Sequence, residues 1–366
     1  MKNSKPNILF VASFPPPLHG SALMSQYIKD SKLINETFDC DYINLSTSRR
    51  IDEIGKSNPI KIWRLFTALM LLMWKLAIKH YDLCYLAITC HGIGFLKDAP
   101  FVLLCKLFGR KIIIHQHNKG MSKDVDRRPY KWLMPIVYKN VKVVLLSERL
   151  YPDIEKVVPI ENVYICPNGI PEVDYEYKGS DNEVPHLLFL SNLMESKGII
   201  VLLDALEIVH DKGLAFCCDI VGAETKELTG RRLSEEIYKR GLRDLIIYHG
   251  RKTGTEKERL FKMADVMIHP TLDDCFPLVL LEAMQYGLPI VTTDEGGILD
   301  MVSDGVNGLI CEKRNPESLA KCIISLISDS VIRSRMGKSS FEIFEKDYTI
   351  AVFEKRLKGI LDNECI

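Results

Sequence analysis

The chain has 366 residues, of which 47% are hydrophobic and 26% charged, and its 48 basic side chains balance 48 acidic ones. This length predicts two domains, and the charge balance does not favour nucleic-acid binding, for which a strongly basic domain is expected. The charges are unevenly spread: residues 1–180 hold 25 basic and 17 acidic residues, and residues 181–366 hold 23 and 31. The first half therefore carries +8, which suits an anionic bilayer or an acidic acceptor.

The cysteines and the N-terminal residues indicate the compartment. None of the 11 cysteines lies in a Cys-x-x-Cys arrangement, which favours small buried side chains in a reducing environment over a zinc or redox centre. The first residues, MKNSKPNILFVAS, lack the apolar stretch and the cleavage site of a signal peptide. We therefore expect a cytoplasmic protein.

Short apolar runs alternate with helical patterns along the whole chain. They cover residues 7–13, 83–88, 111–117, 141–147 and 162–167, and then 186–192, 216–222, 245–250, 266–270, 288–293 and 308–311. Continuous runs of Val, Ile and Leu with helices between them predict parallel sheets that are covered on both faces. The expected fold class is α/β, with two doubly wound, Rossmann-like domains.

The segment 59–80 has two interpretations. Its centre, residues 65–74, is uncharged but too short for the ~20 apolar residues that cross a membrane. Asn58 as a cap and Pro59 in the first turn predict a helix here. Basic residues flank the centre, so the helix could lie along the inner face of a membrane as a peripheral contact. An apolar centre favours instead a buried helix beneath a sheet.

A polar segment at residues 171–185 predicts the domain linker. The expected domains are therefore 1–178 and 179–339, followed by a C-terminal helix at 340–366 that crosses back to the first domain. In the second half, Thr255 and Glu258 have the spacing of a capping box. Asn315 followed by proline predicts another helix start.

The stretch 273–291, DDCFPLVLLEAMQYGLPIV, predicts an anion-binding helix start. If Pro277 is the first helical residue, three backbone N–H groups remain free just after a strand, those of Leu278, Val279 and Leu280. Free amides and the helix dipole together favour a phosphate at this position. Gly287, followed two residues later by proline, is expected to end the helix.

Two acids belong to the same stretch. Asp274 is expected in the loop at the carboxyl edge of the sheet, where doubly wound folds bind ligands, and Glu282 lies in the helix. The two carboxylates should be on the order of 10 Å apart, well beyond the ~5 Å of a retaining glycosidase pair. They would hold two ends of one elongated ligand. Taken singly, Asp274 also fits an ordinary loop acid and Glu282 a solvated helix position.

The complete pattern is Asp, x, Phe, five residues, Glu-Ala, then Gly-x-Pro and a strand. It resembles the donor-binding signature of glycosyltransferase family 4, the glycogen-synthase-like retaining enzymes with the GT-B fold, also called glycosyl transferases group 1. In that family the motif is Glu, seven residues, Glu, whereas the first acid here is Asp274. The resemblance extends over the second half and more loosely over the first, and it implies two Rossmann-like domains facing a central cleft.

Other segments resemble the same family. FLSNLMESKGI, residues 189–199, resembles its Gly-Arg-Leu, five residues, Lys-Gly element, which implies that Lys197 contacts the diphosphate. Asn192 stands where the family usually has Arg, and an Asn supplies neither charge nor a bidentate fork. Gly296 and Gly297 would form a loop that approaches phosphate or sugar closely, although a plain tight turn has the same sequence.

The first half resembles the family in two places. Gly20 begins a predicted helix after His19, where the family often has Gly-Gly near the donor phosphates. His117, after the strand KIIIH, corresponds to the family's histidine beside the transferred sugar, whereas His115 should be buried. A zinc site at these two histidines lacks a third ligand with suitable spacing.

The resemblance implies a retaining transfer of a sugar from a nucleoside-diphosphate sugar to an acceptor hydroxyl, without a metal or another cofactor. The acceptor would be a carbohydrate or a lipid-linked molecule in polysaccharide or glycolipid biosynthesis. Catalytic roles would fall to His117, Lys197 and Asp274. The donor-binding residues would be Gly20, Asn192, Lys197, Asp274, Phe276, Pro277, Leu278, Val279 and Glu282.

Two other functions remain open from the sequence. A nucleotide-sugar epimerase on the same fold would also carry paired sheets and a nucleotide clamp. A catalytically silent scaffold subunit at the membrane would explain the Asp and Asn departures from the family pattern. Release of free nucleoside diphosphate only in the presence of acceptor separates a transferase from both.

Overall fold

The computed structural model describes residues 5–17, 19–46, 59–175, 177, 179 and 182–365. The chain divides into two compact units, Met1–Asn168 with Ile350–Ile366, and Gly169–Thr349. We call them unit 1 and unit 2. The sequence placed the corresponding divisions after residues 178 and 339, at the polar segment and before the last helical pattern. The structure places the first one ten residues earlier and the second one ten residues later.

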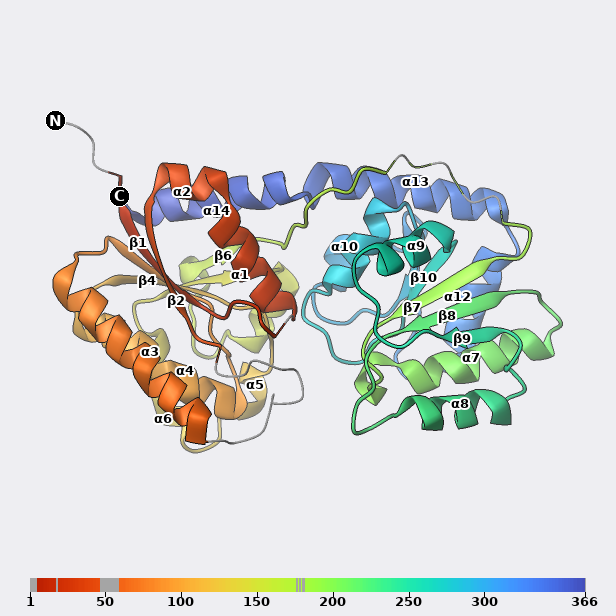
Figure 1. Ribbon diagram of the computed structural model, residues 1–366, viewed down its shortest axis with the longest axis horizontal. Helices are drawn as coiled ribbons and strands as arrows, with labels where there is room; N and C mark the ends of the chain where they lie inside the picture. The colour runs from red at the N-terminus through yellow and green to blue at the C-terminus, as the bar shows by residue number, and fades with distance from the viewer. Residues whose placement is uncertain are drawn as a thin grey trace. The chain divides into compact units, whose positions relative to one another are not determined.

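Unit 1 contains a six-stranded parallel sheet in the order β2-β1-β3-β4-β5-β6 (Figure 1). Its strands are β1 (Asn7–Ala12), β2 (Asp39–Asn44), β3 (Leu83–Leu86), β4 (Lys111–His115), β5 (Lys142–Leu145) and β6 (Val163–Ile165). Its helices are α1 (Gly20–Asp30), α2 (Lys32–Thr37), α3 (Pro59–Ile78), α4 (Gly92–Leu107), α5 (Met121–Asp124), α6 (Tyr130–Tyr138) and α14 (Ile350–Cys365), with the 3₁₀ turns η2 (Glu148–Asp153) and η3 (Ile160–Asn162).

Helices cover both faces of this sheet. Figure 1 shows α1, α2 and α14 on one side of the sheet and α3, α4 and α6 on the other. The helix α14 packs against α2, and Glu364 accepts a hydrogen bond from the Tyr164 hydroxyl at 2.7 Å. The last helix of the chain is therefore part of unit 1.

Unit 2 contains a second six-stranded parallel sheet, in the order β12-β11-β10-β7-β8-β9. Its strands are β7 (His186–Leu190), β8 (Cys217–Val221), β9 (Ile246–Tyr248), β10 (Val266–His269), β11 (Ile290–Thr292) and β12 (Gly308–Ile310). Its helices are η4 (Glu195–Lys197), α7 (Ile199–Asp211), α8 (Gly230–Lys239), α9 (Thr255–Met263), α10 (Leu278–Gln285), α11 (Ile298–Met301), α12 (Pro316–Ile327) and α13 (Ser330–Asp347).

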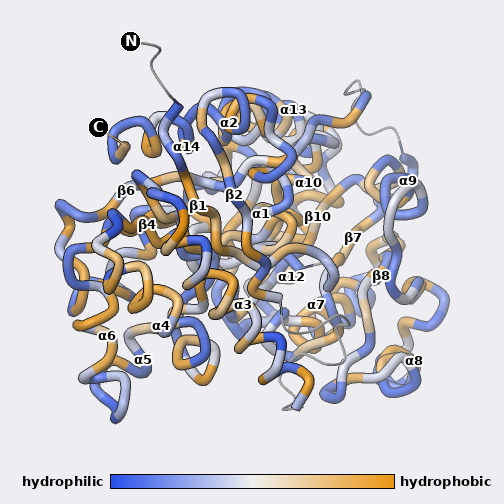
Figure 2. Tube along the Cα trace, turned by 60° about the vertical axis from the view of Figure 1, so that its left-hand side comes forward, coloured by the Kyte–Doolittle hydropathy of each residue, from blue (hydrophilic) through white to orange (hydrophobic). Residues whose placement is uncertain are grey.

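The doubly wound α/β fold expected from the sequence is confirmed. Each apolar run of the sequence forms a strand, and Figure 2 shows β1 and β7 as apolar stretches of the chain. In unit 2 the core joins β7 to α7 and α12 through side chains such as Phe189, Leu203 and Ile323, none of which is exposed. Burial of such continuous apolar strands on both faces is what fixes a parallel sheet.

The strand β2 was not predicted. Its sequence, DCDYIN, alternates polar and apolar residues, and it lies at the edge of the sheet beside β1. Asp41 accepts hydrogen bonds from Lys79 at 3.0 Å and from the Tyr81 hydroxyl at 2.9 Å, and it also pairs with Lys75. Contacts with distant parts of the chain thus stabilise acids that appear unsuited to a strand.

The prediction that α3 is buried is wrong. Only Leu72 and Leu76 of this helix are buried, whereas the side chains of Trp63, Phe66 and Trp74 are 65%, 52% and 57% exposed. Asn58, the expected cap, lies outside the described residues. Within the described ranges, no helix has both the length and the apolar character needed to span a membrane. The helix rests on the sheet through one narrow stripe.

The predicted helix ends are partly confirmed. Asn315 caps α12, because its side chain accepts a hydrogen bond from the Ser318 N–H at 2.9 Å. Gly287, with a φ of 65°, lies just beyond the end of α10. The capping box at Thr255 is wrong: this residue is already helical, and Gly254 occupies the cap position of α9.

Candidate functional site

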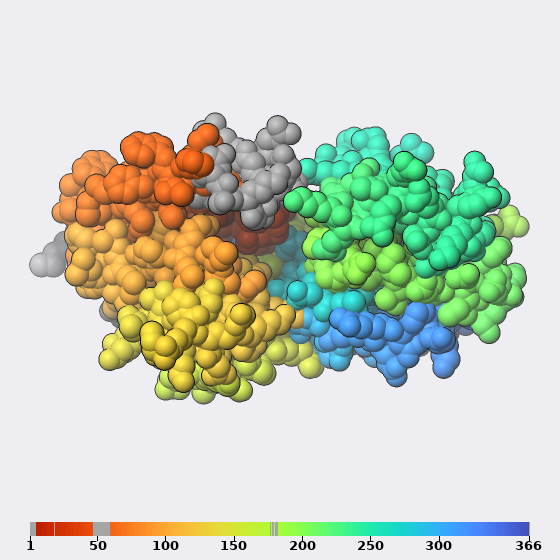
Figure 3. Space-filling view, turned by 90° about the horizontal axis from the view of Figure 1, so that it is seen from below, coloured from red at the N-terminus to blue at the C-terminus, as the bar shows by residue number. Residues whose placement is uncertain are grey.

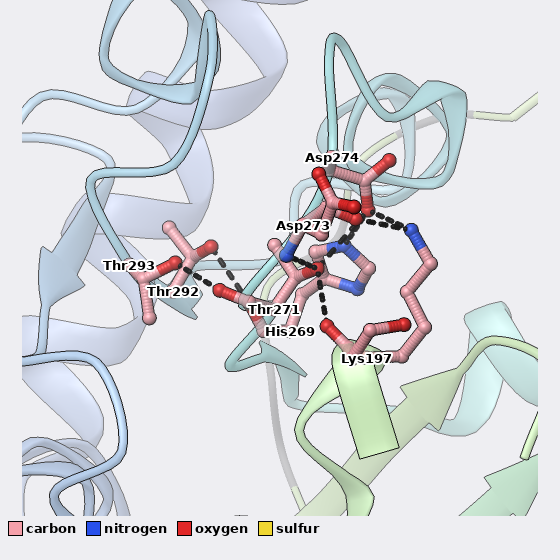
Figure 4. A network of polar contacts seen from close by, with 8 residues as sticks. Lys197, His269, Thr271, Asp273, Asp274, Thr292 and Thr293 are labelled. Carbon is pink, nitrogen blue, oxygen red and sulfur yellow. Dashed lines mark hydrogen bonds and ion pairs between the residues drawn. The ribbon is translucent and has the colours of Figure 1, made fainter. Parts of the chain in front are cut away.

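Polar side chains gather at the carboxyl end of β10 in unit 2 (Figure 4). The Oδ2 atom of Asp274 accepts hydrogen bonds from Lys197 Nζ at 2.8 Å, from His269 Nε2 at 3.0 Å and from the Thr271 hydroxyl at 3.3 Å. Lys197 also donates to the carbonyl of Asp273 at 2.7 Å. Among the described residues, all hydrogen bonds to the Asp274 carboxylate reach Oδ2, so Oδ1 is available to a ligand hydroxyl.

Gly198 brings Lys197 to this position. It has a φ of 78°, and a Cβ atom at this residue would lie 2.0 Å from the carbonyl oxygen of Pro270. Only glycine permits both the left-handed conformation and the close approach of the two backbones. The turn that carries Lys197 therefore packs directly against the loop that follows β10.

Two threonines at the end of the neighbouring strand β11, Thr292 in the strand and Thr293 just after it, hydrogen-bond to the backbone at the end of β10 and in the loop that follows. The Thr292 hydroxyl donates to the His269 carbonyl at 2.8 Å, and the Thr293 hydroxyl donates to the Thr271 carbonyl at 2.6 Å. Both threonines are buried. Buried hydrogen bonds of this kind fix the backbone that presents His269 and Thr271 to the carboxylate.

The Asp274 carboxylate is stabilised as an anion. Burial alone would raise the pKa of Asp274, but the hydrogen bond and charge of His269, together with those of Lys197, outweigh it and hold the pKa well below its ordinary value. For His269 to donate from Nε2, a proton must lie on that nitrogen. The cluster thus combines a fixed anion with a lysine whose ammonium is held in a defined place.

The start of α10 differs from the prediction by one residue. Pro277 is the cap and not the first helical residue, because the helix begins at Leu278. The N–H of Leu280 donates to the Pro277 carbonyl at 3.1 Å, so it is not one of the free amides that were expected. The N–H groups of Leu278 and Val279 belong to the first turn, where a helix has no acceptors of its own.

The corner before α10 is firmly packed. Phe276 is 5% exposed, and its ring lies 6.1 Å from that of Tyr348. Gly296 closes the other side: with a φ of 57°, it places its backbone where a Cβ atom would lie 2.4 Å from the Asp274 carbonyl. The N–H of Gly297 donates to the Cys275 carbonyl at 2.8 Å. The two glycines therefore shape the corner, and the Gly297 N–H is engaged in a hydrogen bond within the protein.

Glu282 and Asn192 lie outside the hydrogen-bonded cluster. Glu282 accepts a hydrogen bond from Lys257 of α9 at 2.7 Å, and its side chain is 20% exposed. Asn192 is exposed in the loop after β7, and its side chain forms no hydrogen bond with the cluster within the described chain. Glu282 is thus an anchored, half-buried acid, and Asn192 faces solvent.

His117 lies in unit 1, in a pocket of about 210 Å³ that His19, Lys97 and Asn118 also line. Part of the His117 residue reaches solvent, but both of its ring nitrogens are buried and have no partner among the described residues. Gly20, beside His19, is the exposed first residue of α1. The first half of the chain therefore supplies a separate polar pocket.

Burial and the neighbouring histidines lower the pKa values of His117 and His115. Burial, and then the charge of His19, lower the pKa of His117 to about 4. Burial, and then His117, lower the pKa of His115, whose ring lies 4.2 Å from that of His117. His115 is fully buried, as expected, with Nδ1 2.5 Å from the Tyr85 hydroxyl. His117 is therefore neutral at neutral pH and can exchange hydrogen bonds with an uncharged hydroxyl.

The structure brings together Lys197, Asp274 and the Phe276–Val279 corner. The sequence analysis missed His269, Thr271 and Lys257 as partners of the two acids. A polar residue at the carboxyl end of a buried strand, such as His269, was the available signal. Across the described residues, no group of three or more His, Cys, Asp and Glu side chains is placed to hold a metal ion.

Comparison with known proteins gives a consistent result. Residues 174–342 match the family model described as glycosyl transferases group 1. An amylovoran biosynthesis glycosyltransferase of Erwinia amylovora is 25% identical over 230 residues, which are 60% of this chain and 56% of that protein. The matches to the first curated relatives span between 46% and 61% of those proteins' own lengths.

Solved structures share the fold over the whole chain. Sucrose-phosphate synthase from Thermosynechococcus elongatus gives a TM-score of 0.77 at 15% identity, covering 98% of this chain and 99% of that one. HepE from Anabaena, in complex with UDP-glucose, gives a TM-score of 0.70 at 16% identity, again covering 98% and 99%. The fold is therefore the GT-B fold expected from the sequence.

Proposed function

Because unit 2 matches the glycosyl transferases group 1 model, we propose that the protein is a glycosyltransferase that uses a nucleoside-diphosphate sugar. Unit 2 would bind this donor, and unit 1 would bind the acceptor. The observation that carries the proposal is the fixed pair of Lys197 and Asp274 beside the first turn of α10. A cation and helix amides suit a diphosphate, and a carboxylate suits the hydroxyls of a sugar.

The transfer breaks the bond between the anomeric carbon and the diphosphate, and it forms one between that carbon and the acceptor oxygen. Negative charge grows on the departing diphosphate as its bond breaks. Lys197 and the amides of Leu278 and Val279 would stabilise this charge, which is usually the largest catalytic contribution in such a site. The acceptor hydroxyl loses its proton, and the leaving diphosphate oxygen is the acceptor for it. No protein side chain needs to become a covalent nucleophile.

Asp274 would have two roles in this scheme. Its Oδ2 atom holds Lys197 in place, and its Oδ1 atom would accept a hydrogen bond from a sugar hydroxyl. Aspartate is one methylene shorter than the family's glutamate, and the direct contact with Lys197 at 2.8 Å fits that shorter reach. Glu282 would accept hydrogen bonds from the ribose hydroxyls, with Lys257 holding its carboxylate.

The remaining predicted residues would contribute to orientation. His117, neutral at neutral pH, would exchange hydrogen bonds with the transferred sugar or with the acceptor. Gly20, Asn192 and the Phe276–Pro277 corner would lie along the donor. We further propose that the anomeric configuration is retained, as in family 4, and that Lys197 and the helix amides neutralise charge without a metal. Activity that survives chelation would support the last point.

The comparisons suggest the first substrates to test. HepE is described in complex with UDP-glucose, and the Erwinia relative acts in amylovoran biosynthesis. We therefore propose a uridine-diphosphate sugar as donor and a growing carbohydrate or a lipid-linked sugar as acceptor. Thermal melts with different nucleotides would decide between donors.

A panel of nucleoside diphosphates and their sugars provides the test. A cognate donor at about a hundred times its dissociation constant should stabilise the protein by ~2.7 kcal/mol in a thermal melt. UDP release should then require an acceptor, which excludes the epimerase and the silent scaffold. A panel without any stabilising nucleotide would contradict the proposal, because the anion site at Lys197 would then bind something else.

A further inference from the structure

The layer of unit 1 formed by α3, α4 and α6 exposes large apolar side chains. The helix α3 packs against α4, and α4 packs against α6; Figure 3 shows the three helices side by side on the surface, in orange to yellow. We call this surface the helical face. Its most prominent side chains are Trp63, Phe66 and Trp74 of α3, Leu107 of α4, and Trp132 and Ile136 of α6.

All three tryptophans of the chain lie on this face. Trp63, Trp74 and Trp132 are 65%, 57% and 58% exposed. Tryptophan is normally highly buried in soluble proteins, and it is enriched where one side of a surface is apolar and the other wet, as at membrane interfaces. Three exposed tryptophans on neighbouring helices therefore need a partner that covers them.

The charges around the face are mainly positive. The α3 segment contains Lys61, Arg64 and Lys75 and no acid. Residues 123–139 contain five basic side chains against two acidic ones, Asp124 and Asp126. Lys75 is paired with an acid of β2, and Arg127 is paired with Asp124, so the charge of each is partly neutralised. An apolar face within a basic surrounding is complementary to anionic headgroups above acyl chains.

The basic residues and the aromatic rings also contact one another directly. The guanidinium of Arg128 lies 4.7 Å from the ring centroid of Trp132, and the rings of Trp63 and Phe66 are 5.9 Å apart. This arrangement places charge at the edge of the apolar surface, as in proteins that lie on a membrane. Since no described helix can span a bilayer, contact through the surface is the mode that fits.

We propose that the helical face binds the surface of a bilayer that contains anionic phospholipid. The tryptophans would lie at headgroup level, and Arg128 and Lys131 would contact phosphates. This inference goes beyond the proposed transfer reaction and does not depend on it, because none of these residues belongs to the Asp274 cluster or lines the His117 pocket. A protein that failed to bind any nucleotide could still bind lipid in this way.

The intrinsic fluorescence of the full chain tests the proposal, because every tryptophan lies on the face. Vesicles with about 30% anionic phospholipid should shift the emission to shorter wavelength, and brominated acyl chains should quench it. Vesicles of zwitterionic lipid alone should have a much smaller effect, and salt raised from about 0.05 to about 0.5 M should reverse most of the binding.

Flotation of variants assigns the effect to these residues. W63Q combined with W74Q should weaken vesicle binding at least about tenfold, because each tryptophan buries a large apolar area. Tyr238→Gln, at a residue of α8 in unit 2 that is 70% exposed, is the matched control and should bind like the unchanged protein. R128Q combined with K131Q should reduce the dependence on anionic lipid.

Three results would overturn the proposal. One is emission that does not change with anionic vesicles. Another is a W63Q/W74Q variant that floats as well as Tyr238→Gln. The third is a shift to shorter wavelength that grows with protein concentration in the absence of lipid, which would assign the face to a second copy of the chain. Circular dichroism of each variant confirms that the fold is intact, and nucleotide-dependent thermal stabilisation reports separately on the proposed function.

Discussion

Lys197 Nζ lies 2.8 Å from Asp274 Oδ2, although 77 residues separate the two in the chain. Gly198 and the loop after β10 create this contact, because their backbones approach so closely that no side chain fits between them. The pair joins a cation to the start of α10 at the carboxyl edge of the unit 2 sheet.

Lys197→Met should lower kcat by about 10²- to 10³-fold, because it removes a preformed charge from the departing diphosphate. The measurement is acceptor-dependent release of nucleoside diphosphate at saturating donor. Lys252→Met is the matched control, since Lys252 forms a similar 2.8 Å pair with Glu256 on the exposed surface of α9. A Lys197 variant as active as this control would contradict the proposed role.

Glu282→Gln should weaken donor binding by roughly 10- to 100-fold, as expected for the loss of hydrogen bonds to a charged group. Isothermal calorimetry with the cognate donor gives the value. Glu256→Gln, at an exposed acid of α9, should leave the affinity unchanged. Affinity that is the same in both variants would mean that the ribose lies elsewhere.

Gly198→Ala should destabilise unit 2 by roughly 2–4 kcal/mol, because the new methyl group meets the Pro270 carbonyl in a left-handed backbone. Gly213→Ala separates the two causes: its φ is 71°, but nothing lies within 4 Å of the added atom. This control should lower the free energy of unfolding by only about 1 kcal/mol. Urea unfolding measures both, and equal losses would show that the contact with Pro270 is unimportant.

His117 makes stability depend on pH. Its pKa is lowered to about 4 in the folded protein, whereas an unfolded histidine titrates near ~6.5, so the unfolded chain binds the proton first. Its contribution is therefore fully present above about pH 6.5 and is lost as the pH falls towards 4. The loss amounts to at most about 3 kcal/mol.

His117→Asn should flatten this pH dependence of the free energy of unfolding, measured by urea unfolding between about pH 7 and pH 4. The remaining slope would include His115 and His19, whose pKa values are also lowered by burial first. Substitution of the exposed His210 serves as control. A slope unchanged by His117→Asn would show that the ring is not held neutral by its surroundings.

The sequence predicted the strands well because a strand buried on both faces is apolar over its buried length, as the three isoleucines before His115 in β4 are. It did not predict β2, whose acids are stabilised by Lys75 of α3 and by Lys79 just after this helix, more than thirty residues away in the chain. Pairing between distant residues leaves no periodic pattern in the sequence. The same reason explains why His269 and Lys257 were missed beside Asp274 and Glu282.

The exposure of α3 also could not be predicted from the sequence. Its apolar centre fits a core helix and a surface helix equally well, and only the width of the contact with the sheet decides between them. Only Leu72 and Leu76 of this helix are buried. At α10 the sequence located the helix start within one residue, because Phe276 and Pro277 mark it, but hydrogen bonding of Leu280 depends on the turn geometry.

The helix α14 returns to the sheet that the first strands of the chain began, so unit 2 is inserted within unit 1. During synthesis on the ribosome, unit 2 emerges as one continuous segment and can fold as soon as it is released. Unit 1 begins to be translated first, yet it is completed only after unit 2 has been made, because residues 350–365, which pack against α2, follow unit 2 in the chain. A product stalled after unit 2 would therefore contain a complete unit 2, whereas its unit 1 would lack the helix α14.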